Sequence, residues 1–390
     1  MDTLKVNNFG PIREAEVTFG DLTILIGPQA SGKSLFLELF KLIVDRKHII
    51  STLRKYNYIL RKEDASQLLE FYFGEGMGGI LRNDTVIEFS GEEFGKDTLQ
   101  TAMKKSGSSQ PPEMVFYVPA QRILSIDDGR PKVFSEFNIS TPYPLRMFSE
   151  TLRVFIQGVL GNPDVIFPMN SRLKSSMRKS IKDTIFHDGK VVIDQSTGQR
   201  KMKLQIGDTR LPFMAWSAGQ KEFMPLLLAI YCLSGPPSSV VNKSNYRWVI
   251  IEEPEMGLHP RALEAVMLEV IELMQSGYKV IISTHSSALL ELVWTINNLC
   301  GNDAATIKSA LCELFGIRAE SKAATVFENI ADKEFRTYYF SSRPHEDGVK
   351  ATDISSLNVN SDDMDVSEWG GLSYFASKAS EVVSRHIPID

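Results

Sequence analysis

One short segment constrains the fold of this chain more than any other. Leu22-Thr23-Ile24-Leu25-Ile26 is a continuous apolar run of strand length, typical of a central strand that is buried on both faces. A glycine-bearing loop follows it, and residues 34–44 have the density of apolar side chains expected of a buried helix. A strand, a glycine loop and a helix in this order are the context that a phosphate-binding loop requires.

The loop itself, Gly27-Pro28-Gln29-Ala30-Ser31-Gly32-Lys33-Ser34, matches Gly-x-x-x-x-Gly-Lys-Ser/Thr in full. Its glycines let backbone N–H groups turn toward phosphate oxygens, and the start of the following helix favours negative charge. We expect Lys33 to neutralise the β- and γ-phosphates of ATP and Ser34 to bind Mg²⁺. The alternative is a chance glycine turn, which the strand before the loop and the helix after it argue against.

A second strand-like segment, Trp248–Ile251, ends in two adjacent carboxylates, Glu252 and Glu253. A buried strand does not normally finish in two acids, because each charge needs a partner or a metal. We expect Glu252 to hold Mg²⁺, and Glu253 to orient and deprotonate an attacking water. A strand that simply meets solvent is the alternative, and the phosphate loop upstream favours the catalytic interpretation.

Two further segments occupy positions where α/β proteins place ligand contacts. Ser217-Ala218-Gly219-Gln220 precedes a helix, and a serine cap with small residues makes a helix start that is suited to anions. Ser283-Thr284-His285-Ser286 follows a strand at residues 279–282, outside the carboxyl end of the sheet. Taken alone, these segments are better explained as a plain cap and a structural histidine.

Taken together and in this order, the four motifs resemble an ABC-type ATPase, and within that class the OLD-like group of bacterial defence and repair proteins. The most specific string is Glu-Pro-Glu-x-x-Leu-His-Pro at residues 253–260. The resemblance covers residues 1–45 and 213–345 well and the middle of the chain in outline. It implies ATP and Mg²⁺ as cofactors.

The resemblance also implies roles for individual residues. Glu253 would be the catalytic carboxylate and His285 the γ-phosphate switch. The segment Ser217 to Gln220, through Ser217 and Gly219 in particular, would contact nucleotide held by a second copy, and Met256–His259 would be the loop between the two copies. Gln121, just after a strand at residues 114–118, resembles the glutamine of the Q-loop. The chain departs from the pattern in having Ala218 for the first glycine of the signature stretch, and Glu252 for an aspartate.

We predict an α/β fold: a P-loop NTPase head of the ABC type with a mainly parallel sheet and flanking helices. Residues 1–45 and 213–345 would form the head, 46–212 an inserted α/β segment, and 346–390 a helical tail packing on the head. Within the head, a helix over residues 260–274 should bury an apolar stripe and leave Glu264, Glu269 and Glu272 outward.

Composition gives expectations about the cellular compartment of the chain and about its binding to membranes and nucleic acid. The 390 residues include three scattered cysteines, which fits a reducing compartment, and no leader or membrane-spanning run is evident. We therefore expect a cytoplasmic protein that does not enter a membrane. The net charge of −5 gives no global footprint for nucleic acid, so DNA binding stays open but unsupported. One dense basic run is better explained as a solvated helix face than as a DNA or effector contact: Arg172, Lys174, Arg178, Lys179 and Lys182.

The expected function is an ATP-hydrolysing switch that assembles with itself through shared nucleotide sites. OLD-like nucleases carry a TOPRIM domain, but the acidic tract at 362–365 is not preceded by an apolar strand ending in Glu-Gly. The chain would then act on a separate effector, such as a nuclease or toxin, in anti-phage defence. The alternatives are a DNA-repair or chromosome-maintenance ATPase acting on DNA ends, and a scaffold that binds ATP but scarcely hydrolyses it.

Overall fold

A computed structural model describes residues 2–104, 111–160, 164–196, 198–236, 238, 241–342 and 348–386. The Ser-, Gly- and Pro-rich stretch at 106–112 predicts a linker or an exposed loop, and its residues 106–110 lie outside the described ones. The strands are β1 (Thr3–Phe9), β2 (Ile12–Thr18), β3 (Leu22–Ile26), β4 (Val86–Phe89), β5 (Glu92–Glu93), β6 (Val115–Val118), β7 (Ile126–Asp127), β8 (Arg130–Pro131), β9 (Val165–Phe167), β10 (Lys190–Asp194), β11 (Lys201–Ile206), β12 (Thr209–Pro212), β13 (Trp248–Glu252), β14 (Lys279–Ser283), β15 (Phe335–Ser341) and β16 (Val349–Asp353). The α-helices are α1 (Lys33–Lys55), α2 (Ala65–Phe73), α3 (Lys96–Lys104), α4 (Tyr143–Val154), α5 (Ser175–Ile181), α6 (Ala218–Ser234), α7 (Pro260–Gln275), α8 (Ser287–Leu299), α9 (Ala304–Leu314), α10 (Met364–Ser367) and α11 (Tyr374–His386).

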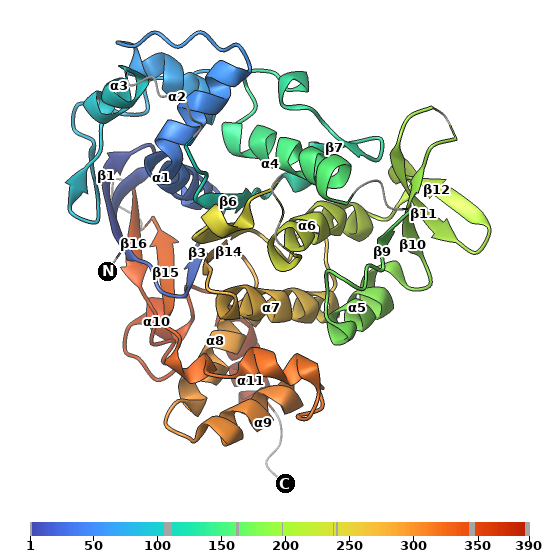
Figure 1. Ribbon diagram of the computed structural model, residues 1–390. Helices are drawn as coiled ribbons and strands as arrows, with labels where there is room; N and C mark the ends of the chain where they lie inside the picture. The colour runs from blue at the N-terminus through green and yellow to red at the C-terminus, as the bar shows by residue number, and fades with distance from the viewer. Residues whose placement is uncertain are drawn as a thin grey trace.

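A ten-stranded sheet in the order β5-β4-β1-β2-β16-β15-β3-β14-β13-β6 forms the centre of the molecule (Figure 1). Its half from β15 to β6 is entirely parallel. The other half contains the antiparallel pairs of β1 with β2 and β4, which were not expected. The predicted α/β fold with a mainly parallel sheet is confirmed, and the phosphate loop leaves β3 in the middle of the parallel half.

The parallel strands are buried on both faces, as their apolar sequences predict. Alternate residues of β3 point into different cores, because successive side chains of a strand face opposite sides of the sheet. Ile24 and Ile26 join the core formed by α6, α7 and α8, whereas Leu25 joins the core of α1 and α2. Helices on both faces therefore hold the carboxyl ends of these strands, where the motifs lie, in fixed positions.

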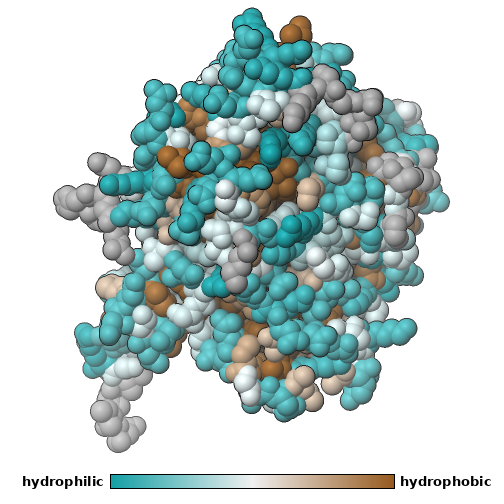
Figure 2. Space-filling view, turned by 60° about the vertical axis from the view of Figure 1, so that its left-hand side comes forward, coloured by the Kyte–Doolittle hydropathy of each residue, from teal (hydrophilic) through white to brown (hydrophobic). Residues whose placement is uncertain are grey.

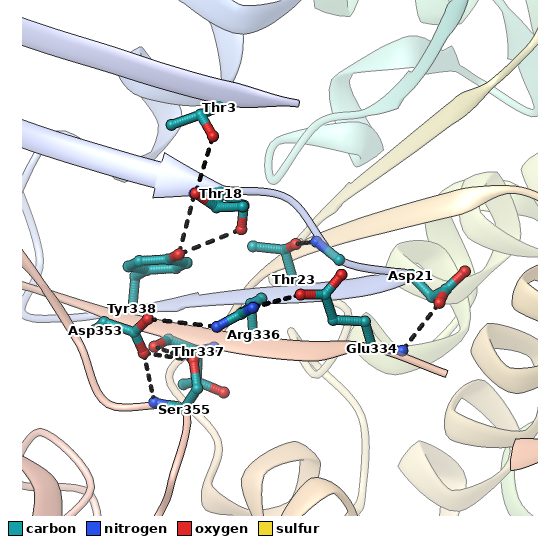
Figure 3. Close-up of polar contacts among 11 residues, drawn as sticks. Thr3, Thr18, Asp21, Thr23, Glu334, Arg336, Thr337, Tyr338, Asp353 and Ser355 are labelled. Carbon is teal, nitrogen blue, oxygen red and sulfur yellow. Dashed lines mark hydrogen bonds and ion pairs between the residues drawn. The ribbon is translucent and has the colours of Figure 1, made fainter. Parts of the chain in front are cut away.

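Strand β15 comes from late in the chain. In the sheet it lies between β16, which follows it in the sequence, and β3, which belongs to the start of the sequence. Figure 3 shows the polar contacts that fasten it. The Tyr338 hydroxyl accepts from the Thr18 backbone N–H at 3.0 Å, and the Glu334 N–H donates to the Asp21 carboxylate at 2.9 Å. The Thr337 N–H donates to the Ser355 hydroxyl at 2.9 Å. The first two contacts fix β15 to segments near the start of the chain, and the third fixes it to the segment that follows β16.

The segment predicted as an insertion, residues 46–212, is not separate from the large sheet. It supplies β4, β5 and β6 to that sheet. Strands β9 to β12 form a separate antiparallel sheet in the order β12-β11-β10-β9, which lies far from β1 in Figure 1, and β7 and β8 form a two-stranded one. In sequence, residues 191–193 and 202–206 resemble the two arms of a hairpin, and they form the antiparallel pair β10 and β11. The tail is not helical throughout, since β16 pairs with β15 and β2, and α11 has no buried residue. The division into domains stays a prediction.

Helix α7 corrects one prediction about charged residues. Glu264 is exposed as expected, but Glu269 is only 2% exposed, and neither of its carboxylate oxygens has a hydrogen-bond partner among the described residues. Glu272 is half-buried and forms an ion pair with Lys174 at 2.5 Å. The apolar surface of α7 is wider than its stripe in the sequence suggested, because α5 packs over the side that was expected to face water.

The basic run is likewise not one solvated face. Arg172 is buried and donates to the Tyr231 carbonyl at 3.2 Å. Lys174 pairs with Glu272, and the Arg178 guanidinium donates to the Leu173 carbonyl. Lys179 and Lys182 are the two cations of the run that stay exposed. Three of the five cations thus serve the local fold, because loops and helix ends around α5 present carbonyls and a carboxylate to them.

The buried Glu269 leads to a prediction on stability. Burial raises its pKa to about 8, so the folded protein holds a proton there that the unfolded chain releases near pH 4.5. Stability should therefore fall as pH rises from about 5 to about 8 and level off above that, by up to about 1.4 kcal/mol per pH unit. Glu269→Gln should remove this slope in urea unfolding, whereas Glu264→Gln should keep it. Parallel slopes in all three proteins would contradict the assignment.

The surface shown in Figure 2 is mainly hydrophilic, with hydrophobic side chains in small groups. None of the described helices is long and apolar enough to cross a membrane.

Candidate nucleotide site

The phosphate loop has the backbone conformation that its glycines predict. Gly32 has φ +83°, and Ala30, at +60°, also adopts the left-handed region. Gly27 leaves β3 so close to β15 that a Cβ there would meet the Phe340 carbonyl oxygen at 2.2 Å. The backbone of the loop can therefore curl around an anion, and Pro28, Gln29 and Ala30 expose its outer side.

Lys33 lies at the start of α1 and points back into this loop. Its ammonium donates to the Gly27 carbonyl at 2.7 Å, the Pro28 carbonyl at 2.9 Å and the Ser31 hydroxyl at 3.2 Å. Burial lowers the pKa of Lys33, while the nearby carboxylates oppose this shift, Glu253 most strongly. A cation held among neutral oxygens is suited to receive a phosphate, which would offer it a full negative charge.

Ser34 and Glu252 meet where a metal ion would lie. Glu252 ends β13 and is 4% exposed; its Oε2 accepts from the Ala120 N–H at 3.1 Å, while Oε1 has no hydrogen-bond partner among the described residues. Burial raises the pKa of Glu252, and the neighbouring hydroxyls of Ser34 and Tyr117 lower it. An unpartnered buried carboxylate oxygen beside a serine hydroxyl fits a hard divalent cation such as Mg²⁺.

Glu253 follows β13 directly, but its backbone is no longer extended. Its φ is +43°, and its N–H donates to the Ser283 carbonyl of β14 at 2.8 Å. The Glu253 Oε1 lies 3.6 Å from the Nε2 of His285. The Glu255 carboxylate accepts from the Thr284 hydroxyl at 2.9 Å and the His285 N–H at 2.6 Å. Hydrogen bonds therefore connect the ends of β13 and β14. The predicted base, Glu253, and the predicted switch histidine, His285, face each other.

Ser217 forms the N-cap of α6. Its hydroxyl accepts from the Gln220 N–H at 3.3 Å, and its own N–H donates to the Gln220 side chain at 3.1 Å, which makes a capping box. Gln220 also donates to the Ile185 carbonyl, so its side chain serves the helix start. A Cβ at Gly219 would meet the Gly257 carbonyl oxygen at 2.6 Å. The signature segment thus packs on the loop that follows Glu253 in its own chain.

Gln121 is exposed and follows β6. It lines a cavity of about 150 Å³ together with Ser34, Glu38 and Glu252. Gln121 therefore lies beside the two predicted metal ligands, as a Q-loop residue would. Glu38, one turn further along α1 than Ser34, was not predicted; burial raises its pKa well above the usual range.

Two further residues of the site also escaped the sequence analysis. Arg122 is fully buried directly after Gln121, and its guanidinium donates to three backbone carbonyls near the site. Glu255 anchors the His285 segment, although its only signal in the sequence was its place in the string at 253–260. Hydrogen bonds to backbone carbonyls have no pattern in the sequence, so the role of Arg122 could be found only in the structure.

The fold and these motifs define an ATPase of the ABC type. Residues 1–98 match a family model described as an AAA ATPase domain. Residues 165–291 match one described as "AAA domain, putative AbiEii toxin, Type IV TA system". The Old nuclease of Escherichia phage P2 is 27% identical over 160 residues, which are 40% of this chain and 26% of the phage protein. The match therefore spans about a quarter of that relative. These findings confirm the resemblance to OLD-like ATPases.

Two solved structures are similar to the chain at low scores. The SMC head domain from Thermotoga maritima has a TM-score of 0.37 and 11% identity, covering 90% of this chain and 97% of that one. An ATP-binding subunit of an ABC transporter has a TM-score of 0.32 and 15% identity, covering 74% and 82%. Because these scores are low, the fold assignment depends on the strand order and the motifs and not on these superpositions.

Proposed function

We propose that two copies of this chain bind ATP between them, hydrolyse it, and so control a separate effector protein. The observation that carries the shared site is the start of α6. Ser217 and Ala218 are exposed at a capped helix terminus, which is a ready anion site, and Met214 just before them is 68% exposed. An exposed anion site beside an apolar side chain suits contact with a phosphate that another copy presents.

In this proposal the residues of one chain divide the work of hydrolysis. Lys33 and the N–H groups of the loop hold the phosphates, and Ser34 and Glu252 would hold Mg²⁺, which neutralises developing charge on the phosphate oxygens. Glu253 accepts a proton from water as the water oxygen bonds to the γ-phosphorus and the bond to the ADP oxygen breaks. His285, 3.6 Å from Glu253 Oε1, would contact the γ-phosphate.

The effector is proposed from two findings on relatives. The match covers only part of a nuclease, and the description of one matching family model names a toxin. An ATPase that switches a nuclease or toxin in anti-phage defence, within the cytoplasm, is consistent with both. The alternative, a DNA-repair ATPase, requires a cationic surface for phosphates. Three of the five clustered cations are instead engaged within the chain.

The proposal is tested by capture from the native host. We expect tagged Glu253→Gln, loaded with ATP, to retain one effector protein in fixed ratio, and Lys33→Ala to lose it, because only the first variant holds two copies closed. Mass spectrometry identifies the bound protein, and addition of that purified protein back to the ATPase should make its nuclease or toxin activity depend on ATP. Retention of DNA without any effector protein, persisting at about 150 mM salt, would favour the repair alternative.

A further inference from the structure

We infer that Arg122 is a positioning residue that holds Glu253 in its active conformation and connects it to α6. This inference rests on the proposal that Glu253 is the catalytic base. Arg122 begins the short helical turn η1 (Arg122–Ser125) that follows β6, and η1 packs against α6. Its side chain is fully buried, so it cannot serve as a surface contact for nucleic acid or for a partner protein.

Among the described residues, Arg122 donates hydrogen bonds to backbone carbonyls only. Nη1 donates to the Glu252 carbonyl at 3.0 Å and to the Glu253 carbonyl at 3.2 Å, and Nη2 donates to the Glu253 carbonyl at 3.2 Å. Nε donates to the Glu222 carbonyl in the second turn of α6 at 3.1 Å. A guanidinium is planar and its donors are fixed relative to one another. One rigid group therefore sets the distance between the end of β13 and α6.

Glu253 has a particular need for such support. Its φ of +43° is unusual for a residue with a side chain, and such conformations persist only where the surroundings enforce them. The Ser283 carbonyl fixes its N–H, and Arg122 fixes its carbonyl through two N–H groups. With both ends of the residue held, the Glu253 carboxylate is aimed toward His285 and not along the strand.

The second end of the connection lies at the signature segment. Gly219 packs on Gly257, and a Cβ at Gly257 would lie 3.1 Å from the Glu222 side chain, so α6 and the loop after Glu253 fit closely. If the phosphate of a nucleotide bound to a second copy contacts Ser217, we expect α6 to shift. That shift moves the Glu222 carbonyl. Arg122 passes that movement to the Glu253 carbonyl. Occupation of one nucleotide site would thereby adjust the base of the other.

Charge supports the same placement. Four glutamates, Glu222, Glu252, Glu253 and Glu255, surround the guanidinium; burial lowers the pKa of Arg122 and these carboxylates raise it. The retained positive charge offsets the repulsion among acids that converge on one site. Lysine at position 122 would keep the charge but lose the fork of donors, so Arg122→Lys separates geometry from charge.

We expect Arg122→Lys to lower the single-turnover rate of ATP hydrolysis by about 10- to 100-fold, the scale of an error of about 1 Å in positioning. Affinity for ATP should stay within about twofold, because Lys33 and the loop are untouched. Arg146→Lys is the matched control: Arg146 is also fully buried and donates to the Tyr58 hydroxyl at 2.7 Å and to the Phe71 carbonyl, away from the site. It should hydrolyse at the wild-type rate per folded molecule.

Three outcomes would each contradict a different part of this inference. Hydrolysis by Glu253→Gln at the wild-type rate would remove the proposed base itself. An inactive Glu253→Gln beside an Arg122→Lys that matches Arg146→Lys would remove only the positioning role. Equal losses of affinity and rate in Arg122→Lys would mark a general structural role. Arg122→Gln, which keeps two donors without the charge, replaces the lysine variant if that protein does not fold, and the same criteria apply.

Discussion

Replacement of Lys33 by alanine should reduce steady-state ATP hydrolysis by at least about 100-fold, the scale on which a single aimed donor contributes in enzymes. The ammonium is held in place by the Gly27 and Pro28 carbonyls and the Ser31 hydroxyl, so the loop presents it to a phosphate before any ligand arrives. Affinity for ATP should fall as well, because the variant lacks the cation that faces the β- and γ-phosphates.

The fold should survive this change. Lys33 is 6% exposed, and burial opposes its charge, so its loss removes a desolvated cation as well as three hydrogen bonds. We expect the melting temperature to move by only a few degrees, measured by circular dichroism. Lys47→Ala, an exposed lysine on the same helix, is the control and should hydrolyse normally. Turnover by purified Lys33→Ala at the wild-type rate would refute the phosphate-loop assignment.

The sequence predicted those parts of the site that depend on neighbours in the chain. The strand, glycine loop and helix around Lys33 are local, and so are the acids that end β13. The segments ending at Glu253 and His285 were placed at one edge of the sheet because parallel strands share that edge. β13 and β14 are indeed adjacent and parallel, which brings the two residues together.

Features that depend on distant parts of the chain could not be predicted in this way. β15 and β16 come from the last part of the chain but pair with β3 and β2, and no local pattern encodes that register. Glu269 was placed outward because the helix period marks the apolar stripe and cannot show that α5 covers the next position. Arg122 was passed over because its partners are carbonyl groups, which every residue carries.

The shared site leads to the second large effect, in which two substitutions abolish hydrolysis for opposite reasons. Glu253→Gln keeps the shape of the side chain but removes the base and a negative charge near the γ-phosphate. ATP should bind, remain intact and hold two copies together. Ser217→Arg places a bulky cation at the exposed start of α6. Each copy should then bind ATP but fail to close on its partner, so hydrolysis should fall by about 100-fold or more in both variants.

Solution size distinguishes the two variants. With ATP and Mg²⁺, light scattering should report a dimer for Glu253→Gln and a monomer for Ser217→Arg, and an equal mixture of Glu253→Gln with Lys33→Ala should show fewer dimers than Glu253→Gln alone. Absence of ATP-dependent association in Glu253→Gln, or normal hydrolysis by Ser217→Arg, would refute the shared site. A dimer that persists without ATP through another surface would hide this change in size. In that case a disulfide cross-link between the two copies tests the shared site.

The cross-link should join the phosphate loop of one copy to the signature segment of the other. Gln29 is a better position for a cysteine than Ser31, because Gln29 is exposed whereas Ser31 is buried. Cys300 is exposed and has to be replaced by serine first, while Cys232 and Cys312 are buried and can remain. Gln29→Cys and Ser217→Cys, placed on separate chains, should form a disulfide only with ATP present. If neither nucleotide nor Mg²⁺ changes the yield of that disulfide, the two segments do not meet across a shared nucleotide, and each chain hydrolyses ATP with its own residues alone.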